Sequence, residues 1–334
     1  MTRDNLARRI DPPGSTLHAV DGGAASRAGM GREYTALLFV QLFFGALPIA
    51  VKLAVRDLTS PALALIRVVG AALLFNILQR VLVGERIRDR RDYLLLAVYA
   101  VFGVILNQLL YITALTLTTA TAAQTLVCAG PAMTLLIAIV ARRETATRLK
   151  WAGIAVAALG ALWLVGVGAR TGNALGNLLA LMNVAAYSVY LVISRGLLRK
   201  YDALTVITWV FTFGALGILP WGIVPLYRQI GHVSAQGWAS VAFIIVLPTI
   251  GAYWLNIYAL KRVESSVVSV FVYLQPMITA LIAIPVLHEH VSPRLLPAAA
   301  LIFAGVGLTL WEGRRERRRR GARPSPAEQE MVEQ

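Results

Sequence analysis

The chain is poor in charged residues. Only 15% of its 334 residues are Asp, Glu, Lys or Arg, while 57% are hydrophobic. Soluble proteins average about 25% charged and roughly 45 to 50% apolar residues. The mean hydropathy is +0.67, and the charges gather at the termini and in short connectors. This composition excludes a soluble fold of this size and predicts long apolar segments that lie in a lipid bilayer.

The sequence lacks the residues needed for disulfide formation, ATP hydrolysis and metal or enzyme chemistry. The single cysteine, Cys128, excludes an intramolecular disulfide. No G-x-x-x-x-G-K-[ST] motif occurs, so the chain has no loop that would cradle ATP phosphates. A membrane enzyme would need converging nucleophiles, bases or metal ligands, and the only close histidine pair, His288 and His290, is too sparse for a metal site. We therefore expect no catalytic residue, no metal and no cofactor.

Acidic residues and histidines are also missing from the middle of the apolar segments. All 17 Asp and Glu residues and all 4 His residues fall in termini, connectors or segment ends. Proton-coupled carriers usually keep a titratable carboxylate or histidine along their path. The absence favours facilitated diffusion or exchange driven by the solute's own gradient. Proton coupling through Arg67, a tyrosine or Glu289 at a mouth stays open as an alternative.

The apolar segments have the length of membrane spans. A helix needs roughly 17 to 25 apolar residues to cross about 30 Å of hydrocarbon. We predict ten spans, which makes the chain an all-α membrane protein. The spans are Tyr34–Val55, Pro61–Val83, Tyr93–Leu117, Thr118–Ala141, Trp151–Val167, Gly176–Leu197, Leu204–Leu226, Trp238–Leu260, Ser265–Leu287 and Leu295–Trp311.

Lys and Arg concentrate in alternate connectors, which predicts that those connectors face the cytoplasm. The poor set of connectors holds only Arg56, Arg170, Arg228 and Arg294. Membrane orientation thus accounts for the net charge of +15, and nucleic-acid binding is not expected. With an even number of spans, both termini are cytoplasmic. We predict a polar N-terminal segment over 1–33, five-helix repeats over 34–167 and 176–311 with an external linker over 168–175, and a basic tail over 312–334.

The two halves resemble each other in sequence. The segment Pro131–Ile139 matches Pro276–Ile284 without a gap, 145 residues further along the chain (276 minus 131), and in the same register Glu144 falls on Glu289 and Gly160 on Gly305. Because each half holds an odd number of spans, the second must enter the membrane inverted. Inverted repeats are typical of secondary transporters, in which the substrate site lies between the halves.

These features resemble the drug/metabolite transporter superfamily and, within it, the EamA-type exporters of bacterial inner membranes, which include aromatic amino-acid exporters. The resemblance covers about Tyr34–Trp311 and rests on the two five-helix halves, on Pro61–Arg67 in the second span, and on a mid-helix proline followed by Glu144 or Glu289. It implies export of small organic solutes by alternating access through a cavity lined by the first four helices of each half. Thr208 stands where Arg67 would be repeated.

Polar side chains deep in the spans are candidates for the substrate site, because lipid leaves them without partners. Amides would bind polar ends and tyrosine rings would bind apolar parts of an amino acid, possibly a neutral or aromatic one, or a related metabolite. The candidate substrate-binding residues are Gln41, Asn107, Gln108, Tyr111, Asn183, Tyr187, Tyr190, Tyr253, Asn256, Gln275 and Arg67. For each amide, hydrogen bonding between helices is an equal alternative.

Other residues have expected roles outside binding. Arg67 either snorkels to the interface or binds a carboxylate, and the sequence leaves both open. The prolines proposed as hinges for gating are Pro48, Pro131, Pro248 and Pro276. Interfacial anchoring is expected for Tyr99, Tyr201 and Tyr227, and for the charge of Lys52. Close helix packing is expected for the small residues Gly153, Ala157, Gly160, Ala161, Ala304, Gly305 and Gly307.

The expected partners are membrane lipid and a small-molecule solute. The oligomeric state stays open between monomer and dimer, with the monomer favoured. A channel or a non-transporting membrane subunit is the rival of another class, although a channel would more naturally carry a charged or carbonyl-lined filter.

Overall fold

A computed structural model describes residues 22–144, 147–166, 173–252, 254–255, 271–290, 293 and 295–321. Over these ranges the regular structure is helical and contains no strand. The predicted site residues Tyr253 and Asn256 lie outside the described residues.

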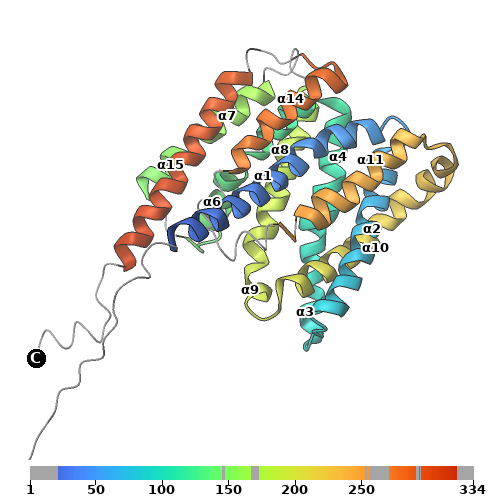
Figure 1. The fold of residues 1–334 in the computed structure, drawn as a ribbon, viewed down its shortest axis with the longest axis horizontal. Helices are drawn as coiled ribbons and strands as arrows, with labels where there is room; N and C mark the ends of the chain where they lie inside the picture. The colour runs from blue at the N-terminus through green and yellow to red at the C-terminus, as the bar shows by residue number, and fades with distance from the viewer. Residues whose placement is uncertain are drawn as a thin grey trace, which may run out of the picture.

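The first half of the chain forms helices between residues 22 and 166 (Figure 1). They are α1 (Gly22–Ala54), α2 (Ser60–Leu82), α3 (Arg90–Ala100), the π-helix η1 (Val101–Leu106), α4 (Asn107–Leu117), α5 (Ala120–Val127), α6 (Gly130–Val140) and α7 (Arg148–Gly166).

The second half follows a similar order. It contains α8 (Ala174–Ile193), α9 (Arg195–Leu198), α10 (Ala203–Gln229), the 3-10 helix η2 (Ile230–His232), α11 (Ala235–Ile245), the π-helix η3 (Val246–Gly251), the 3-10 helix η4 (Val272–Leu274), α14 (Gln275–Leu287) and α15 (Leu295–Gly321).

Short polar side chains begin several of these helices. The side chains of Asp89, Thr119 and Asp202 accept hydrogen bonds from backbone amides in the first turns of α3, α5 and α10. These bonds satisfy N–H groups that have no partner within the helix. The capping residues therefore allow the chain to turn back into the membrane through very short connectors.

Six of the described helical segments are long and apolar enough to cross a membrane, and a seventh is added if the bent pair α5 and α6 counts as one span. Two further apolar helices, Ala235–Gly251 and Val272–Leu287, are shorter. Large apolar side chains cover the outer surface; Val81, Leu94 and Val140 are each 70% exposed or more. An all-helical, multi-pass membrane protein is confirmed, and the count of ten spans stays a prediction.

Several predicted boundaries move. Helix α1 begins at Gly22, before the predicted span, and α15 continues to Gly321 through the predicted basic tail. The tail continues as helix because Arg and Glu are good helix formers. In the first turn of this tail, the Arg315 guanidinium lies 3.8 Å from the Glu312 carboxylate. The two residues are three positions apart, a spacing that brings side chains together on a helical surface.

The fourth and ninth predicted spans are interrupted instead of continuous. Helices α5 and α6 meet at an angle of 40° around Cys128 and Ala129, and η4 precedes α14 in the ninth. Pro131 and Pro276 therefore lie in the first turn of α6 and of α14, where a missing N–H costs no helical hydrogen bond. The expectation of a proline in mid-helix is wrong at both positions. Pro48 lies inside α1 and Pro248 inside η3.

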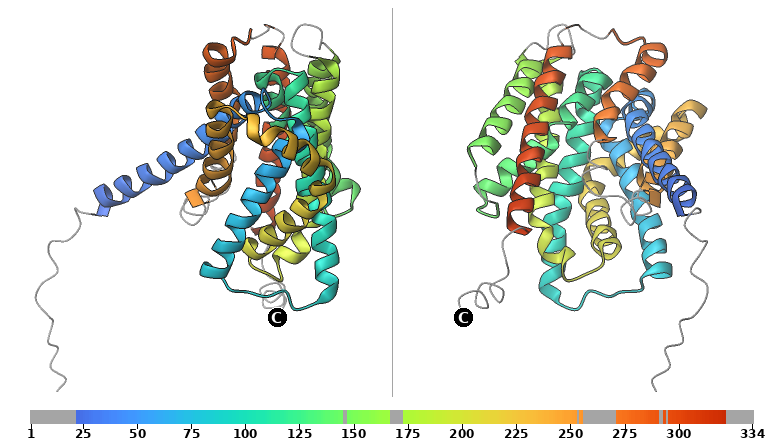
Figure 2. Two further views of the ribbon diagram at one scale, coloured as in Figure 1. Left: turned by 90° about the vertical axis from the view of Figure 1, so that its right-hand side faces the viewer. Right: turned by 60° about the vertical axis from the view of Figure 1, so that its left-hand side comes forward.

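The helices pack in pairs that join distant parts of the chain. Helix α2 lies along α10, α4 along α8, and α1 along both α11 and α14. Helices α7 and α15 lie side by side at one edge of the bundle (Figures 1 and 2). Their contact is close because Gly153 and Gly305 face each other, and a Cβ on Gly153 would be 2.7 Å from the Gly305 oxygen. Close packing is confirmed for these glycines and is wrong for Gly307, which has no atom within 4 Å of such a Cβ.

Candidate functional site

A chain of buried side-chain amides crosses the interior of the bundle. Gln275 at the start of α14 donates from Nε2 to Oε1 of Gln41 on α1 at 2.7 Å. Gln124 on α5 donates from Nε2 to Oε1 of Gln275 at 2.6 Å. The three side chains are at most 7% exposed. An amide both donates and accepts, so consecutive glutamines can pass hydrogen bonds from one helix to the next.

Glycine allows α1 and α14 to approach at this point. A Cβ on Gly45 would lie 2.7 Å from the side chain of Ile278 and 3.2 Å from the backbone oxygen of Gln275. The Thr279 hydroxyl donates to the Gly45 oxygen at 2.7 Å. The close contact of the two backbones places Gln41 and Gln275 within hydrogen-bonding distance of each other.

The amide chain leads to a cation. The Tyr111 hydroxyl on α4 donates to Oε1 of Gln124 at 3.5 Å, a weak hydrogen bond. Tyr111 also interacts electrostatically with the guanidinium of Arg67 on α2. Arg67 is half-buried and has no hydrogen-bond or ion-pair partner within the described part of the chain. A cation at this depth without a counter-charge is costly in a membrane unless an anion or water accompanies it.

The structure brings together four predicted site residues, namely Gln41, Gln275, Tyr111 and Arg67, and adds Gln124. Gln124 is one of the deep polar residues of the predicted spans, but it does not belong to the predicted binding set. The break between α5 and α6 separates Gln124 from the second part of its span.

The remaining described amides of the predicted site, Asn107, Gln108 and Asn183, form a second cluster between α4 and α8. Asn183 donates from Nδ2 to the backbone oxygen of Asn107 at 2.7 Å, so it joins the two helices. Gln108 donates from Nε2 to Oδ1 of Asn107 at 3.3 Å, while its own Oε1 is buried and has no partner among the described residues. Tyr187 and Tyr190 are neighbours with ring centroids 5.7 Å apart, and Tyr187 is 45% exposed.

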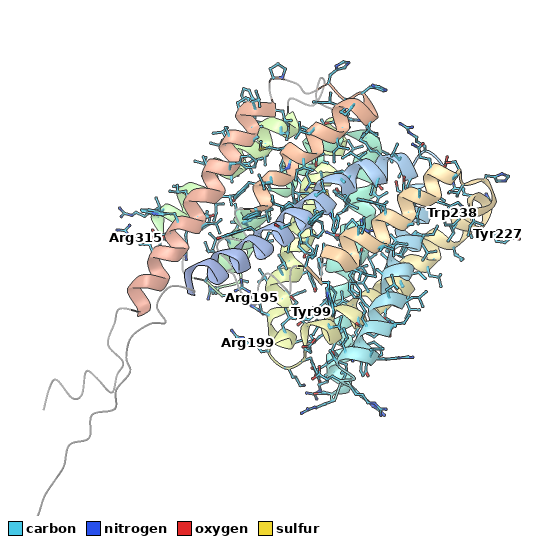
Figure 3. The ribbon with its side chains drawn as sticks, in the orientation of Figure 1. Tyr99, Arg195, Arg199, Tyr227, Trp238 and Arg315 are labelled. Atoms are coloured by element: carbon cyan, nitrogen blue, oxygen red, sulfur yellow. The ribbon has the colours of Figure 1, made fainter. Side chains whose placement is uncertain are left out.

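Polar contacts also join the first turn of α3 to the connector before α10. Asp92 accepts hydrogen bonds from the Tyr201 hydroxyl at 2.7 Å and from Lys200 at 2.5 Å. The hydrogen bond to Asp92 raises the pKa of Lys200 above its ordinary value. Tyr201 and Tyr99 are 4% and 5% exposed, so interfacial anchoring is wrong for both, whereas Tyr227 is 83% exposed at the end of α10 (Figure 3).

Several known proteins similar to this chain are described as uncharacterized transporters. An uncharacterized transporter of Archaeoglobus fulgidus is 28% identical over 222 residues, which cover 65% of this chain and 76% of the relative. An uncharacterized inner membrane transporter of Salmonella typhimurium is 23% identical over 270 residues, which cover 78% of this chain and 88% of the relative.

A solved crystal structure has a similar fold. It superposes with a TM-score of 0.55 at 20% identity and covers 86% of this chain and 97% of its own. The sequence model of the EamA-like transporter family matches the chain twice, over residues 32–166 and over residues 174–311. The predicted resemblance is confirmed, and the protein belongs to the EamA-like transporter family.

Proposed function

We propose that this membrane transporter is a secondary carrier that exports small organic solutes, in particular neutral or aromatic amino acids and related metabolites. The observation that carries the proposal is the amide chain, which continues to Tyr111, together with the cation of Arg67, which has no hydrogen-bond or ion-pair partner among the described residues and acts electrostatically on Tyr111. A carboxylate would neutralise the guanidinium with charge-assisted hydrogen bonds. The amides and Tyr111 would contact the rest of an amphipathic solute. The rival role for Arg67, snorkelling to the interface, would leave the amide chain without a charged end.

The architecture we propose is ten spans in two inverted five-helix repeats, 34–167 and 176–311, with both termini in the cytoplasm of a bacterial inner membrane. The two family matches support it. The π-helices support it independently: η1 and η3 are both six residues long and begin 145 residues apart. The break at Cys128 and Ala129 likewise corresponds to η4 in the second half.

Contacts between the halves support the same symmetry, because they occur in related pairs. The packing of η1 on α8 corresponds to that of η3 on α1, and the packing of α6 on α8 to that of α14 on α1. We therefore propose alternating access, in which these pairs open and close in turn at the two faces. The breaks before Pro131 and Pro276, together with Pro48 and Pro248, are the proposed hinges.

The proposed energy source is the gradient of the solute itself, since mid-span carboxylates and histidines are absent from the sequence. The alternative within the same class is a proton-coupled antiporter. The rival of another class is a channel, which would conduct without saturation. The remaining predicted binding residues, Asn107, Gln108, Asn183, Tyr187 and Tyr190, belong to the proposal as a second contact surface.

Uptake into proteoliposomes tests the proposal. We expect saturable uptake of labelled phenylalanine that is inhibited by unlabelled phenylalanine more strongly than by its amide, which lacks the carboxylate. Arg67→Gln should reduce uptake at least tenfold, whereas Arg80→Gln, an exposed arginine of the same helix, should not. Equal inhibition by the amide would contradict the role of Arg67. Non-saturating flux would favour the channel, and stimulation by a pH gradient would favour the antiporter.

A further inference from the structure

The carboxylate of Glu289 holds three helices together at one face of the bundle. Its Oε1 accepts a hydrogen bond from the backbone N–H of Ala120 at 2.7 Å, and its Oε2 accepts from the backbone N–H of Thr121 at 3.3 Å and from the Thr121 hydroxyl at 3.2 Å. The ammonium of Lys52 lies 3.5 Å from Oε1. Glu289 follows α14, Lys52 is on α1, and Ala120 and Thr121 begin α5.

The contact combines two favourable electrostatic effects. The N-terminus of a helix carries a partial positive charge and free N–H groups, which favour a carboxylate. A lysine adds a full positive charge on the other side. The Glu289 side chain is only 9% exposed and that of Lys52 is 21% exposed, so water screens the pair less than it screens a surface pair.

The same three helices carry the amide chain. Helix α1 provides Gln41, α5 provides Gln124 and α14 provides Gln275. Helix α5 is only eight residues long, and Gln124 lies one turn from the Ala120 amide that Glu289 holds. A movement that detaches the first turn of α5 from Glu289 must therefore move Gln124 as well. The contact at the face and the candidate substrate site are mechanically connected through one short helix.

Glu144 matches Glu289 in the other half, and among the described residues its one side-chain partner is Arg195. Glu144 pairs with Arg195 at 3.4 Å, with side chains that are 33% and 46% exposed. Figure 3 shows Arg195, the first residue of α9, in the lower half of the molecule, whereas α14 ends near the top (Figure 1). Within the described residues, the four contacts of Glu289 at one face are therefore shielded from water. The ion pair of Glu144 with Arg195 at the other face is more exposed.

We propose that Glu289, together with Lys52 and the first turn of α5, is the latch that closes the external face, and that its release is the step that opens the substrate site to that face. This inference rests on the proposed alternating-access transport. It assigns Glu289 a positioning role in the cycle. A static helix cap is the competing explanation, and in that case removing the charge would lower stability without changing which face is open.

The single cysteine of the chain provides a probe. Cys128 follows α5, is fully buried, and lies one helical turn beyond Gln124 on the same side of the helix. A membrane-impermeant methanethiosulfonate carrying a trimethylammonium group can react with Cys128 only after a face has opened. The experiment measures the labelling rate of the full-length protein in right-side-out and in inverted vesicles, for wild type, Glu289→Gln and the matched control Glu144→Gln.

We expect Glu289→Gln to raise the labelling rate about tenfold in right-side-out vesicles, equivalent to about 1.4 kcal/mol in the opening equilibrium, and to leave the rate in inverted vesicles unchanged or lower. Glu144→Gln should not raise the rate in right-side-out vesicles. Lys52→Gln should produce a smaller rise on the same side, because the α5 amides still hold the carboxylate. A melting temperature measured for each variant shows that it is folded.

Two results would overturn the latch: an unchanged labelling rate in a folded Glu289→Gln protein, or an equal rise in both kinds of vesicle. A rise confined to inverted vesicles would support the latch and reverse the proposed orientation. If the labelling responds as expected while phenylalanine uptake is absent, the latch stands and the proposed substrate fails. The two proposals therefore fail separately.

Discussion

Replacing Gly305 by alanine should separate α7 from α15. A Cβ on Gly305 would lie 2.5 Å from the Gly153 oxygen and closer still to the backbone nitrogen of Ala157. Both neighbours are backbone atoms of a helix, so no side-chain rotation can relieve the overlap. An ordinary contact begins near 3.4 Å, so the two helices must move apart by about 1 Å.

The cost of that movement can be estimated. Overpacking a tight contact typically costs about 1 to 3 kcal/mol, and the separation also weakens the dispersion contacts along the rest of the interface. Alanine recovers roughly 0.5 to 1 kcal/mol relative to glycine in a helix interior. We therefore expect Gly305→Ala to lower the free energy of unfolding by about 1 to 2 kcal/mol.

Gly307 provides the matched control, because it lies on the same helix and a Cβ there would meet no atom within 4 Å. Gly307→Ala should be neutral or slightly stabilising. Equilibrium unfolding in mixed micelles can be followed by tryptophan fluorescence, since Trp151 and Trp163 lie on α7 and Trp311 on α15. Equal free energies of unfolding for the two alanine variants would refute the argument from the close contact.

Three further changes test other contacts. Gln275→Leu removes two buried hydrogen bonds and leaves both neighbouring amides unsatisfied, so phenylalanine uptake should fall at least tenfold; uptake equal to wild type would show that the amide chain is not part of the site. Asp57→Ala removes the carboxylate that accepts from the backbone and hydroxyl of Ser234, and the free energy of unfolding should fall by about 1 to 2 kcal/mol; Asp57→Asn should cost less. The hydrogen bond to Asp92 raises the pKa of Lys200 above 10.5, so the stabilisation is fully present below the unfolded-state pKa and is lost as pH rises through the raised folded-state pKa. The difference in melting temperature between wild type and Lys200→Met should therefore shrink as pH rises above the ordinary lysine pKa and through the raised pKa of Lys200, and a constant difference would contradict the ion pair.

Hydrophobic runs of membrane length are enough to predict helices, because lipid leaves the backbone no other partner than itself. Helical residues accordingly occur in every predicted span. The ends are less predictable: the segment after Trp311 is too polar for a span but remains a good helix former, so α15 continues through it. The hydropathy of a segment indicates where the membrane ends, and in α15 the helix continues beyond that point.

The interruptions depend on tertiary contacts that no local pattern contains. Pro131 and Pro276 indicate that a helix must break or bend nearby, but they do not say that the helix restarts with the proline in its first turn. The π-helices η1 and η3 have no proline in common, since Pro248 in η3 corresponds to Gly103 in η1. The similarity of the two halves can therefore be predicted from the sequence, whereas the positions at which each half bends cannot.

From the sequence, residues of the candidate site can be proposed by their type but not by their partners. Deep amides and Arg67 stand out because lipid makes unpaired polar groups costly. Which amides meet depends on helix rotation and on the close approach of α1 and α14 at Gly45. Lys52 illustrates the limit: its position near a span end predicts an interfacial charge, yet it pairs with Glu289, more than 200 residues away in the chain.

The glycine contact between α7 and α15 has a consequence for biogenesis. Helix α7 ends at residue 166 and its partner begins at residue 295, so the ribosome must add well over a hundred residues before the two can meet. At about 5 to 20 residues per second, α7 waits roughly 6 to 26 seconds in the membrane with its glycine surface uncovered. Helix α15 thus completes the packing of the first half, and a chain that lost α15 would expose that surface to the cell's quality-control proteases.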